Sequence, residues 1–203
     1  MKKKPPKFFV LGITGPIGSG KSTLGEILAS AGIPNIEVDQ IGHQVLQNFS
    51  IQQALIKEFG TSILLSDQNI DRKALGKIVF SNSTSMEALN EIVHPPMIKL
   101  VVERISKEKA QGAKAVALIA ALLYSMKLNK YCNKIVYMRA SPHARLSRIV
   151  ASRGLSQEAA RARLLAQDPE PNKGPKVIFC ENTQTIDALS SWAKFNLPLL
   201  FKD

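Results

Sequence analysis

The feature that most constrains the fold is a glycine-rich run near the start of the chain. Residues Gly15–Thr23 read Gly-Pro-Ile-Gly-Ser-Gly-Lys-Ser-Thr and match the pattern G-x-x-x-x-G-K-[ST]. The apolar run Phe8–Ile13 leads into it, and a helix-like stretch, Ser22–Ala31, follows. A strand, a glycine loop and a helix in this order turn backbone N–H groups and a helix N-terminus toward phosphate oxygens. The run therefore predicts a site for a nucleoside triphosphate.

Each residue type in this run has an expected task. Glycine allows positive φ and lets the backbone approach an anion with no Cβ in the way. Lys21 is expected to reach the β and γ phosphates, and the Ser22 hydroxyl to bind Mg²⁺. The alternative is a glycine-rich turn with an unrelated lysine, which the flanking strand and helix disfavour. The residues expected to contact the nucleotide are Gly15, Gly18, Ser19, Gly20, Lys21, Ser22 and Thr23.

The length of 203 residues predicts one domain with room for an inserted subdomain or a lid. Apolar residues make up 45% and charged residues 21%, as is typical of a soluble globular protein. No apolar run is long enough to cross a bilayer, and the basic start, residues 1–7, is expected to be a solvated tail. Cys132 and Cys180 form no C-x-x-C pattern, which predicts buried thiols in a reducing compartment. We therefore expect a cytoplasmic enzyme with no membrane segment.

The formal net charge of +11 is uneven along the chain. Several lysines lie in the N-terminal tail, and a basic cluster lies in the C-terminal half. A basic surface suits any polyanion, including nucleic acid. However, no aromatic residues interleave with the cluster, and no helix-turn-helix, zinc-finger or RNP-like pattern accompanies it. We therefore expect small phosphorylated ligands and no nucleic acid. The cluster consists of Arg139, Arg145, Arg148, Arg153, Arg161, Arg163, Lys173 and Lys176.

After the first helix, the hydrophobic pattern alternates between strands and helices. Residues 40–112 have apolar residues at helical spacing and are expected to be almost entirely helical, with a separate helix Pro95–Lys109 after His94. Ser141 and Pro142 suit the N-cap and the first position of a further helix. Later helices are expected over Ser156–Gln167 and Thr185–Phe195, and strands over Ile36–Val38 (ending in Asp39), Ala115–Leu123, Lys134–Met138 and Val177–Cys180.

Strands that alternate with helices imply an α/β fold with a doubly wound parallel sheet. Such sheets bind ligands at the carboxyl ends of their strands. The helical stretch 40–112 is expected to be an insertion over that edge, and residues 140–176 to form an arginine-rich helix and a lid. The predicted domain spans residues 8–203.

Asp39 is the expected activator of an acceptor hydroxyl. It ends the second predicted strand, where the terminal phosphate of a bound nucleotide should lie. A carboxylate there can accept or orient the proton of an attacking hydroxyl, and it can contact Mg²⁺ through water. The alternative is an N-cap on the next helix, and the two roles are compatible.

Several segments together resemble the dephospho-CoA kinase family over nearly the whole chain. The Leu-Asn-x-Ile-x-His-Pro run at Leu89–Pro95 is more diagnostic than the glycine loop alone. The resemblance implies a P-loop kinase core with a helical acceptor-binding insertion and a mobile lid. It also implies phosphorylation of the 3′-hydroxyl of dephospho-CoA by ATP, the last step of CoA synthesis. The segments are Gly12–Thr23, Ile36–Ile41, Asp71–Leu75 with Val79 and Phe80, Leu89–Pro95, Leu122 and Leu123, Arg145–Arg148, Gly154–Ser156, Ala160–Arg163 with Gln167, and Glu181–Thr183.

The resemblance also implies roles for single residues. It gives Asp39 the base role, and the expected catalytic residues are Asp39, Lys21 and Arg148. Arg148 matches an arginine of the helix before the lid and is the expected clamp on the ATP phosphates, with Arg145 one turn away. Arg72 is expected to meet the phosphates of the acceptor or a neighbouring carboxylate. For any single arginine, a solvated helix face or a structural ion pair is the alternative. His94 is expected to contact the acceptor or to cap the preceding helix.

Some positions depart from the family pattern, and two other functions stay open. His43 stands where the family has an arginine, Ser125 where it has a glutamate, and residues 171–175 replace a Lys/Arg-rich run of the lid. One alternative is a kinase for a nucleoside monophosphate or another hydroxylated metabolite, against which the Leu89–Pro95 run argues. The other is a divergent member that binds nucleotide or CoA without turnover, which the serine at position 125 motivates.

Overall fold

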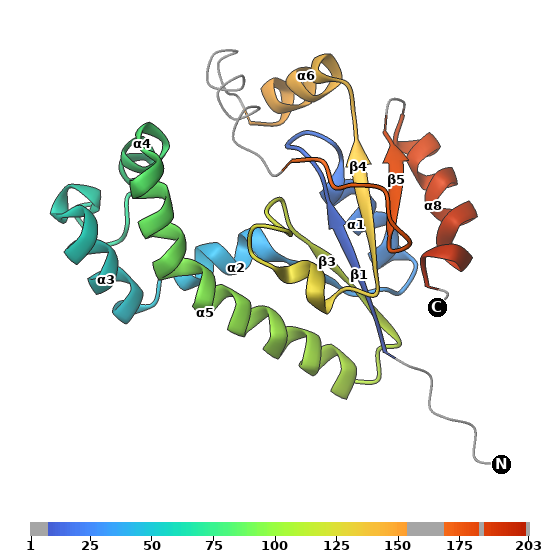
Figure 1. Cartoon of the computed structure of the whole chain (residues 1–203), viewed down its shortest axis with the longest axis horizontal. Helices are drawn as coiled ribbons and strands as arrows, with labels where there is room; N and C mark the ends of the chain where they lie inside the picture. Colours follow the sequence, from blue (N-terminus) through green and yellow to red (C-terminus); the bar gives the residue numbers. More distant parts are fainter. Residues whose placement is uncertain (1–7, 154–168, 183–184, 202–203) are drawn as a thin grey trace. The chain divides into compact units, whose positions relative to one another are not determined.

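The computed structural model describes residues 8–153, 169–182 and 185–201, so the expected helix Ser156–Gln167 lies outside the described residues. The chain forms two compact units. Residues 1–37 and 104–203 make up the first unit, and Val38–Glu103 make up the second. The strands of the sheet belong to the first unit, whereas the second is built from helices (Figure 1).

The first unit contains a five-stranded sheet with the order β2-β3-β1-β4-β5. All neighbouring strands are parallel, as the alternation of strands and helices predicts. Because the carboxyl ends of parallel strands share one edge, the segments that follow the strands gather there. The strands are β1 (Phe9–Thr14), β2 (Asn35–Glu37), β3 (Ala115–Ile119), β4 (Lys134–Arg139) and β5 (Val177–Glu181).

The central strand β1 is buried at every position. A strand of a parallel sheet that is covered on both faces has this continuous apolar character. One face packs against α1 (Lys21–Ser30) and α8 (Ile186–Leu200), where alternate strand residues such as Leu11 and Met138 meet Leu24 and Leu189 in the core. Figure 1 shows α1 and α8 beside the sheet. The core therefore fixes the direction in which β1 presents the loop that follows it.

The opposite face of β1 is closely covered near Gly12. A Cβ at this position would lie 2.8 Å from Cys132 Sγ and 3.2 Å from a methyl carbon of Leu123. Cys132 and Cys180 are both free and buried, as expected from the sequence. Burial raises the pKa of each thiol to about 12.

The helices α6 and α8 begin where the sequence predicts. Helix α6 (Pro142–Arg153) starts after Ser141, whose hydroxyl accepts a hydrogen bond from the Ala144 N–H at 3.2 Å. The Thr185 side chain accepts from the Ala188 N–H at the start of α8. Helix α8 continues to Leu200, beyond the expected end at Phe195, because the buried residues Leu189, Ala193 and Leu200 keep a helical spacing.

The second unit is helical, as the apolar spacing predicts. Two of its helices have side-chain N-caps: Asn48 accepts from the Ser50 N–H, and Asp71 accepts from the N–H groups of Lys73 and Ala74. Such caps satisfy N–H groups that have no partner inside the helix. The helices are α2 (Val38–Val45), α3 (Phe49–Phe59), α4 (Arg72–Ser81) and α5 (Ser83–Ala110), with a short 3-10 turn at Thr61–Ile63. The last turns of α5, from Arg104 on, belong to the first unit.

The expectation of a separate helix starting at Pro95 is wrong, because α5 runs unbroken through Pro95 and Pro96. Proline lacks an N–H, so the carbonyls four residues earlier lose their helical donors. Val93, Met97 and Val101 are nevertheless buried at every fourth position across the prolines. The burial of this apolar stripe outweighs the lost hydrogen bonds and keeps one helix.

Two strand ends also differ from the expectation. Strand β2 ends at Glu37, and Asp39 lies in the first turn of α2 and not at a strand end. The reason is that Val38, Ile41 and Val45 are buried at helical spacing, so the apolar pattern changes period directly after Glu37. Strand β3 ends at Ile119, which pairs with Ile13, because β1 turns into its loop two residues later.

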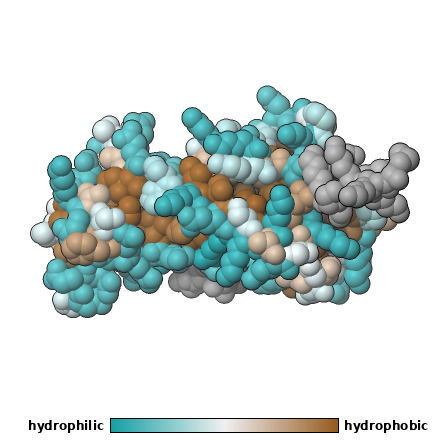
Figure 2. Space-filling view, turned by 90° about the horizontal axis from the view of Figure 1, so that it is seen from below, coloured by the Kyte–Doolittle hydropathy of each residue, from teal (hydrophilic) through white to brown (hydrophobic). Residues whose placement is uncertain are grey.

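The face shown in Figure 2 carries mainly hydrophilic side chains, with apolar patches between them. No helix among the described residues is both long and apolar enough to span a membrane.

The contact at Gly12 gives a prediction about stability. We expect Gly12→Ala to lower the free energy of unfolding by about 1–3 kcal/mol, because the added methyl group overpacks the face that Cys132 covers. In a Gly12→Ala, Cys132→Ala double variant, the loss should be smaller than the sum of the single losses by about 1 kcal/mol. Denaturant unfolding of the three variants measures this coupling.

The matched control is Gly76→Ala in α4, where the added Cβ would meet only Phe80, at an ordinary 3.6 Å. This change should not destabilise the chain, since alanine is the better helix former. Strict additivity of the Gly12 and Cys132 effects would contradict a close contact between the two positions.

Candidate active site

The loop between β1 and α1 adopts a conformation that requires glycine. Gly15, Gly18 and Gly20 have φ values of 135°, 75° and 96°. L-residues with side chains rarely adopt positive φ, so the three glycines are explained by the backbone itself. Gly20 is also the N-cap residue of α1. The predicted strand, glycine loop and helix are thus confirmed.

Two neighbouring elements pack directly against this loop. A Cβ at Gly15 would collide with the backbone of Met138 in β4, and one at Gly18 would lie 2.8 Å from the carbonyl oxygen of Arg145 in α6. The loop is therefore held between the end of β4 and the start of α6, and it has little room to change shape.

Lys21 folds back over the loop. Its Nζ donates to the carbonyl oxygens of Gly15 at 2.8 Å and Pro16 at 3.0 Å. These contacts place an ammonium group on the loop. Ser22 and Thr23 follow in the first turn of α1, with the Ser22 side chain exposed. No acidic residue occupies this turn, so nothing of the helix itself competes with an anion for its N–H groups.

The structure brings Arg148 to the same loop. Its guanidinium donates to the carbonyl oxygens of Gly18 and Asn182, each at 3.2 Å. Arg145, one turn earlier on α6, meets Gly18 through its backbone. Both arginines singled out in the sequence therefore lie at the glycine loop, with Arg148 contacting it through its side chain.

Asn182 is a residue of this site that sequence reasoning missed. It is 8% exposed, and its Nδ2 donates to the Ser19 carbonyl oxygen at 2.8 Å. It directly follows β5, and its own N–H donates to the Arg139 carbonyl at 2.7 Å. Asn182 falls in the Glu181–Thr183 segment of the family resemblance, but a single asparagine after a strand has no spacing signature that points to a loop far away in the sequence.

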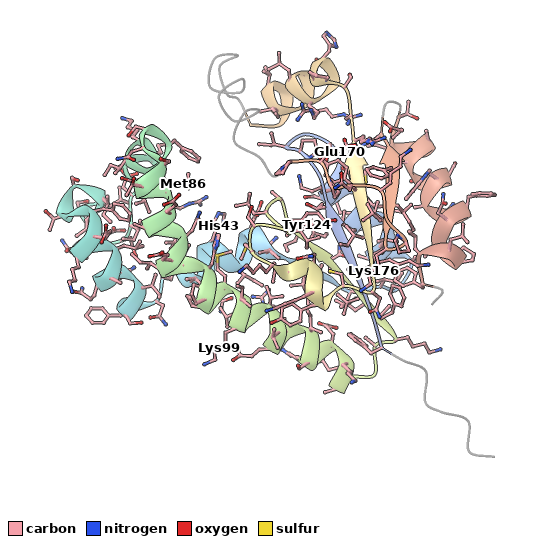
Figure 3. The ribbon with its side chains drawn as sticks, in the orientation of Figure 1. His43, Met86, Lys99, Tyr124, Glu170 and Lys176 are labelled. Carbon is pink, nitrogen blue, oxygen red and sulfur yellow. The ribbon has the colours of Figure 1, made fainter. Side chains whose placement is uncertain are left out.

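Arg139, a member of the basic cluster, is paired with two carboxylates. Its guanidinium pairs with the carboxylate of Glu170 and with that of Glu181 at 2.9 Å, and it lies 4.0 Å from the centre of the Phe179 ring. Figure 3 shows Glu170 near the carboxyl ends of β4 and β5. Two carboxylates offset the charge of Arg139, so it adds little to a positive field at this edge.

In the second unit, Asp39, His43 and Arg72 form an interacting cluster. Asp39 and His43 lie one turn apart on α2, and Arg72 is the first residue of α4. Burial and the positive charge of Arg72 lower the pKa of His43, and the negative charge of Asp39 partly offsets them. His43 is labelled in Figure 3. Asp39 itself is exposed, so its carboxylate is accessible to solvent and ligands.

His94 lies inside α5, directly before the two prolines and next to the buried Val93. Its side chain is half-buried. The expectation that it caps a helix end is wrong, because the helix continues past it. Its contact with the acceptor stays a prediction.

The fold and the loop together define a kinase of the P-loop class: a parallel sheet whose central strand leads through positive-φ glycines and a lysine into a helix. A sequence profile of the dephospho-CoA kinase family matches residues 9–187. The chain therefore belongs to the dephospho-CoA kinase family.

Individual relatives agree with this assignment. A dephospho-CoA kinase of Arabidopsis thaliana is 34% identical and covers 89% of this chain and 78% of its own length. One of Dehalococcoides mccartyi is 34% identical, with 89% and 92% covered. Among solved structures, a protein of Thermus thermophilus matches with a TM-score of 0.79 and 31% identity over 95% of this chain and 98% of its own. A dephospho-CoA kinase of Campylobacter jejuni matches with a TM-score of 0.60 and 26% identity, with 94% and 96% covered.

The cluster on α2 and α4 gives a prediction about pH. The pKa of His43 should lie below its ordinary value of about 6.5, which leaves the ring neutral at pH 7. Arg72→Gln should raise this pKa, because it removes a repelling positive charge. Asp39→Asn should lower it further, because it removes an attracting negative charge. An NMR titration of the His43 ring protons measures both shifts.

Lys73→Gln is the matched control, since Lys73 is the next cation on α4 and exerts no resolved effect on His43. It should leave the His43 titration where it is. If Arg72→Gln moved the pKa of His43 no more than this control does, the described cluster would be incorrect.

Proposed function

We propose that this chain transfers the γ-phosphoryl group of ATP to the 3′-hydroxyl of dephospho-CoA, which yields coenzyme A and ADP. The observation that carries the proposal is the loop after β1, where positive-φ glycines, the Lys21 ammonium and the Arg148 guanidinium meet in a member of this family. Phosphoryl transfer depends mainly on positioning and on positive charge around the transferred group, and this loop supplies both.

In the proposed complex, the phosphates lie on the loop and on the N-terminus of α1. Backbone N–H groups hold the phosphate oxygens, and the Lys21 ammonium leaves the carbonyls of Gly15 and Pro16 for the β and γ phosphates. Arg148 is the proposed clamp on the same phosphates, with Arg145 as a second contact. The remaining proposed contacts come from Gly18, Ser19, Gly20, Ser22 and Thr23.

The residues at the start of α1 also fit a magnesium ion. The exposed Ser22 hydroxyl is an oxygen ligand of the hard type that Mg²⁺ takes, and it lies at the helix turn nearest the phosphates. When bound, Mg²⁺ neutralises charge on the β and γ oxygens. We propose Ser22 as its protein ligand.

Asp39 is the proposed base for the 3′-hydroxyl. Glu37, two residues earlier, lies in register with Ile119, which in turn pairs with Ile13 just before the loop. The chain therefore leaves β2 at the edge of the sheet where β1 leads into the loop. An exposed carboxylate in the first turn of α2 can accept the hydroxyl proton as the phosphoryl group transfers.

Further assignments follow from the same proposal. The insertion at residues 40–112 would bind dephospho-CoA, with Arg72 and His94 as contacts to it. Within residues 140–176, α6 would be the arginine-rich helix, and the expected lid includes residues 154–168, which lie outside the described residues. The two free, buried cysteines suit a reducing compartment, and we propose the cytoplasm as the location.

The test of the activity is ADP release from ATP and Mg²⁺ with dephospho-CoA, AMP or no acceptor. We expect dephospho-CoA alone to stimulate release, with coenzyme A identified by mass. Coenzyme A, which already carries the 3′-phosphate, is the matched control and should not stimulate. Stimulation by AMP only would favour a nucleoside monophosphate kinase, and nucleotide binding with no turnover would favour a non-catalytic member.

A second prediction concerns Asp39. Asp39→Asn should lower turnover at least about a hundredfold, the scale of general-base contributions, and keep ATP affinity within several-fold. Initial rates at saturating substrates and a binding titration measure the two effects.

Asp187→Asn is the matched control, because Asp187 is the acidic residue in the first turn of α8, as Asp39 is in the first turn of α2. It removes the same favourable interaction with a helix N-terminus, worth about 0.3–1 kcal/mol. Equal, small effects of both changes on turnover would remove Asp39 from the base role.

A further inference from the structure

We propose that Asn182 is a positioning residue for nucleotide binding: its side-chain amide fixes the peptide between Ser19 and Gly20, so that the Gly20 N–H is directed at phosphate. The inference rests on the nucleotide site proposed above but not on the identity of the acceptor.

The backbone of Asn182 is anchored on both sides. Its N–H donates to the Arg139 carbonyl at the end of β4, and its carbonyl oxygen accepts from the Arg148 guanidinium. The residue is 8% exposed, so its side chain is closely surrounded. The Asn182 side-chain amide therefore reaches the glycine loop from a backbone that is held at the end of β5.

The amide then acts on one peptide of the loop. Asn182 Nδ2 donates to the Ser19 carbonyl oxygen at 2.8 Å, a short and buried hydrogen bond. No peptide bond of the described chain is cis. In a planar trans peptide the C=O and the following N–H point in opposite directions. Holding the Ser19 carbonyl toward Asn182 thus turns the Gly20 N–H away from it, to the other side of the loop.

The absence of a side chain at Gly20 leaves the space that the Asn182 amide occupies. A Cβ on Gly20 would collide with Asn182 Nδ2, and the backbone there has a φ of 96°. The missing side chain at position 20 therefore makes room for a protein group as well as allowing the turn. Gly20 is the N-cap of α1, so its N–H belongs to the same anion-binding set as the N–H groups of the first helical turn.

Arg148 acts on the neighbouring peptide and strengthens the arrangement. It donates to the Gly18 carbonyl and to the Asn182 carbonyl, and so links the loop to the residue that positions it. Two consecutive carbonyls of the loop, those of Gly18 and Ser19, are thereby fixed by side chains from α6 and from the end of β5.

The experiment is an equilibrium titration of the full chain with ATP and Mg²⁺, without acceptor. Asn182→Asp keeps the size of the side chain but removes the donor and sets a carboxylate oxygen against the Ser19 carbonyl. We expect the dissociation constant for ATP to rise at least about tenfold. Binding of dephospho-CoA, titrated without nucleotide, should stay within about twofold, since the amide does not act on the acceptor.

Asn196→Asp is the matched control. The Asn196 amide donates only within its own helix, to the Trp192 carbonyl, among the described contacts. It should leave ATP affinity unchanged. A second readout is the ¹⁵N–¹H resonance of Gly20 in glycine-labelled protein, whose shift on ATP addition should shrink in Asn182→Asp but persist in Asn196→Asp.

The outcomes separate the two proposals. If Asn182→Asp folds and binds ATP like the unaltered chain, or if it weakens ATP and dephospho-CoA equally, the inference is overturned. If it does not fold, Asn182→Ala replaces it, with the same expectations. Failure of both variants to fold would make the amide a folding determinant and overturn the inference. If the unaltered chain does not bind ATP, the proposed nucleotide site itself is wrong.

Discussion

The hydrogen bonds that hold β1 between β3 and β4 are the constraint on which the site depends. Because β1 is the central strand and is buried at each position, its carboxyl end cannot shift without disturbing both neighbours. The chain must therefore turn at Gly15, against the backbone of β4, and re-enter the core as α1. The two elements that flank the glycine loop are part of the core, so the ends of the loop are held in place. The side chains of Lys21, Arg148 and Asn182 then donate to its carbonyls and complete its conformation.

Much of this arrangement follows from local sequence. The run Gly15–Thr23 gives the loop and its helix, and the apolar segments give a parallel sheet, because these signals depend on residues close together in the chain. Ser141 and Thr185 mark their helix starts through short side-chain hydrogen bonds. The family resemblance adds the choice of Arg148, which the structure places on the loop.

Other features depend on tertiary packing and escape a local pattern. The Pro95–Pro96 pair predicts a helix boundary. However, the apolar residues on either side of the pair are buried, and α5 continues past both prolines. From the sequence alone, Asp39 is predicted to lie at a strand end. The burial of Val38 and Ile41 at helical spacing shows that α2 has already begun there. The contact between Asn182 and Ser19 joins residues 163 positions apart, so no local sequence pattern around either residue predicts it. The pairing of Arg139 with Glu170 and Glu181 likewise depends on the strand register.

The two buried cysteines have a practical consequence for labelling. With a pKa of about 12, each thiol is almost wholly protonated near neutral pH, and only the thiolate reacts readily with alkylating reagents. A cysteine introduced on the surface, with a pKa near 8.5, would therefore react orders of magnitude faster than either native one. Spectroscopic probes can thus be attached at chosen sites on each unit of the folded chain without first removing Cys132 and Cys180.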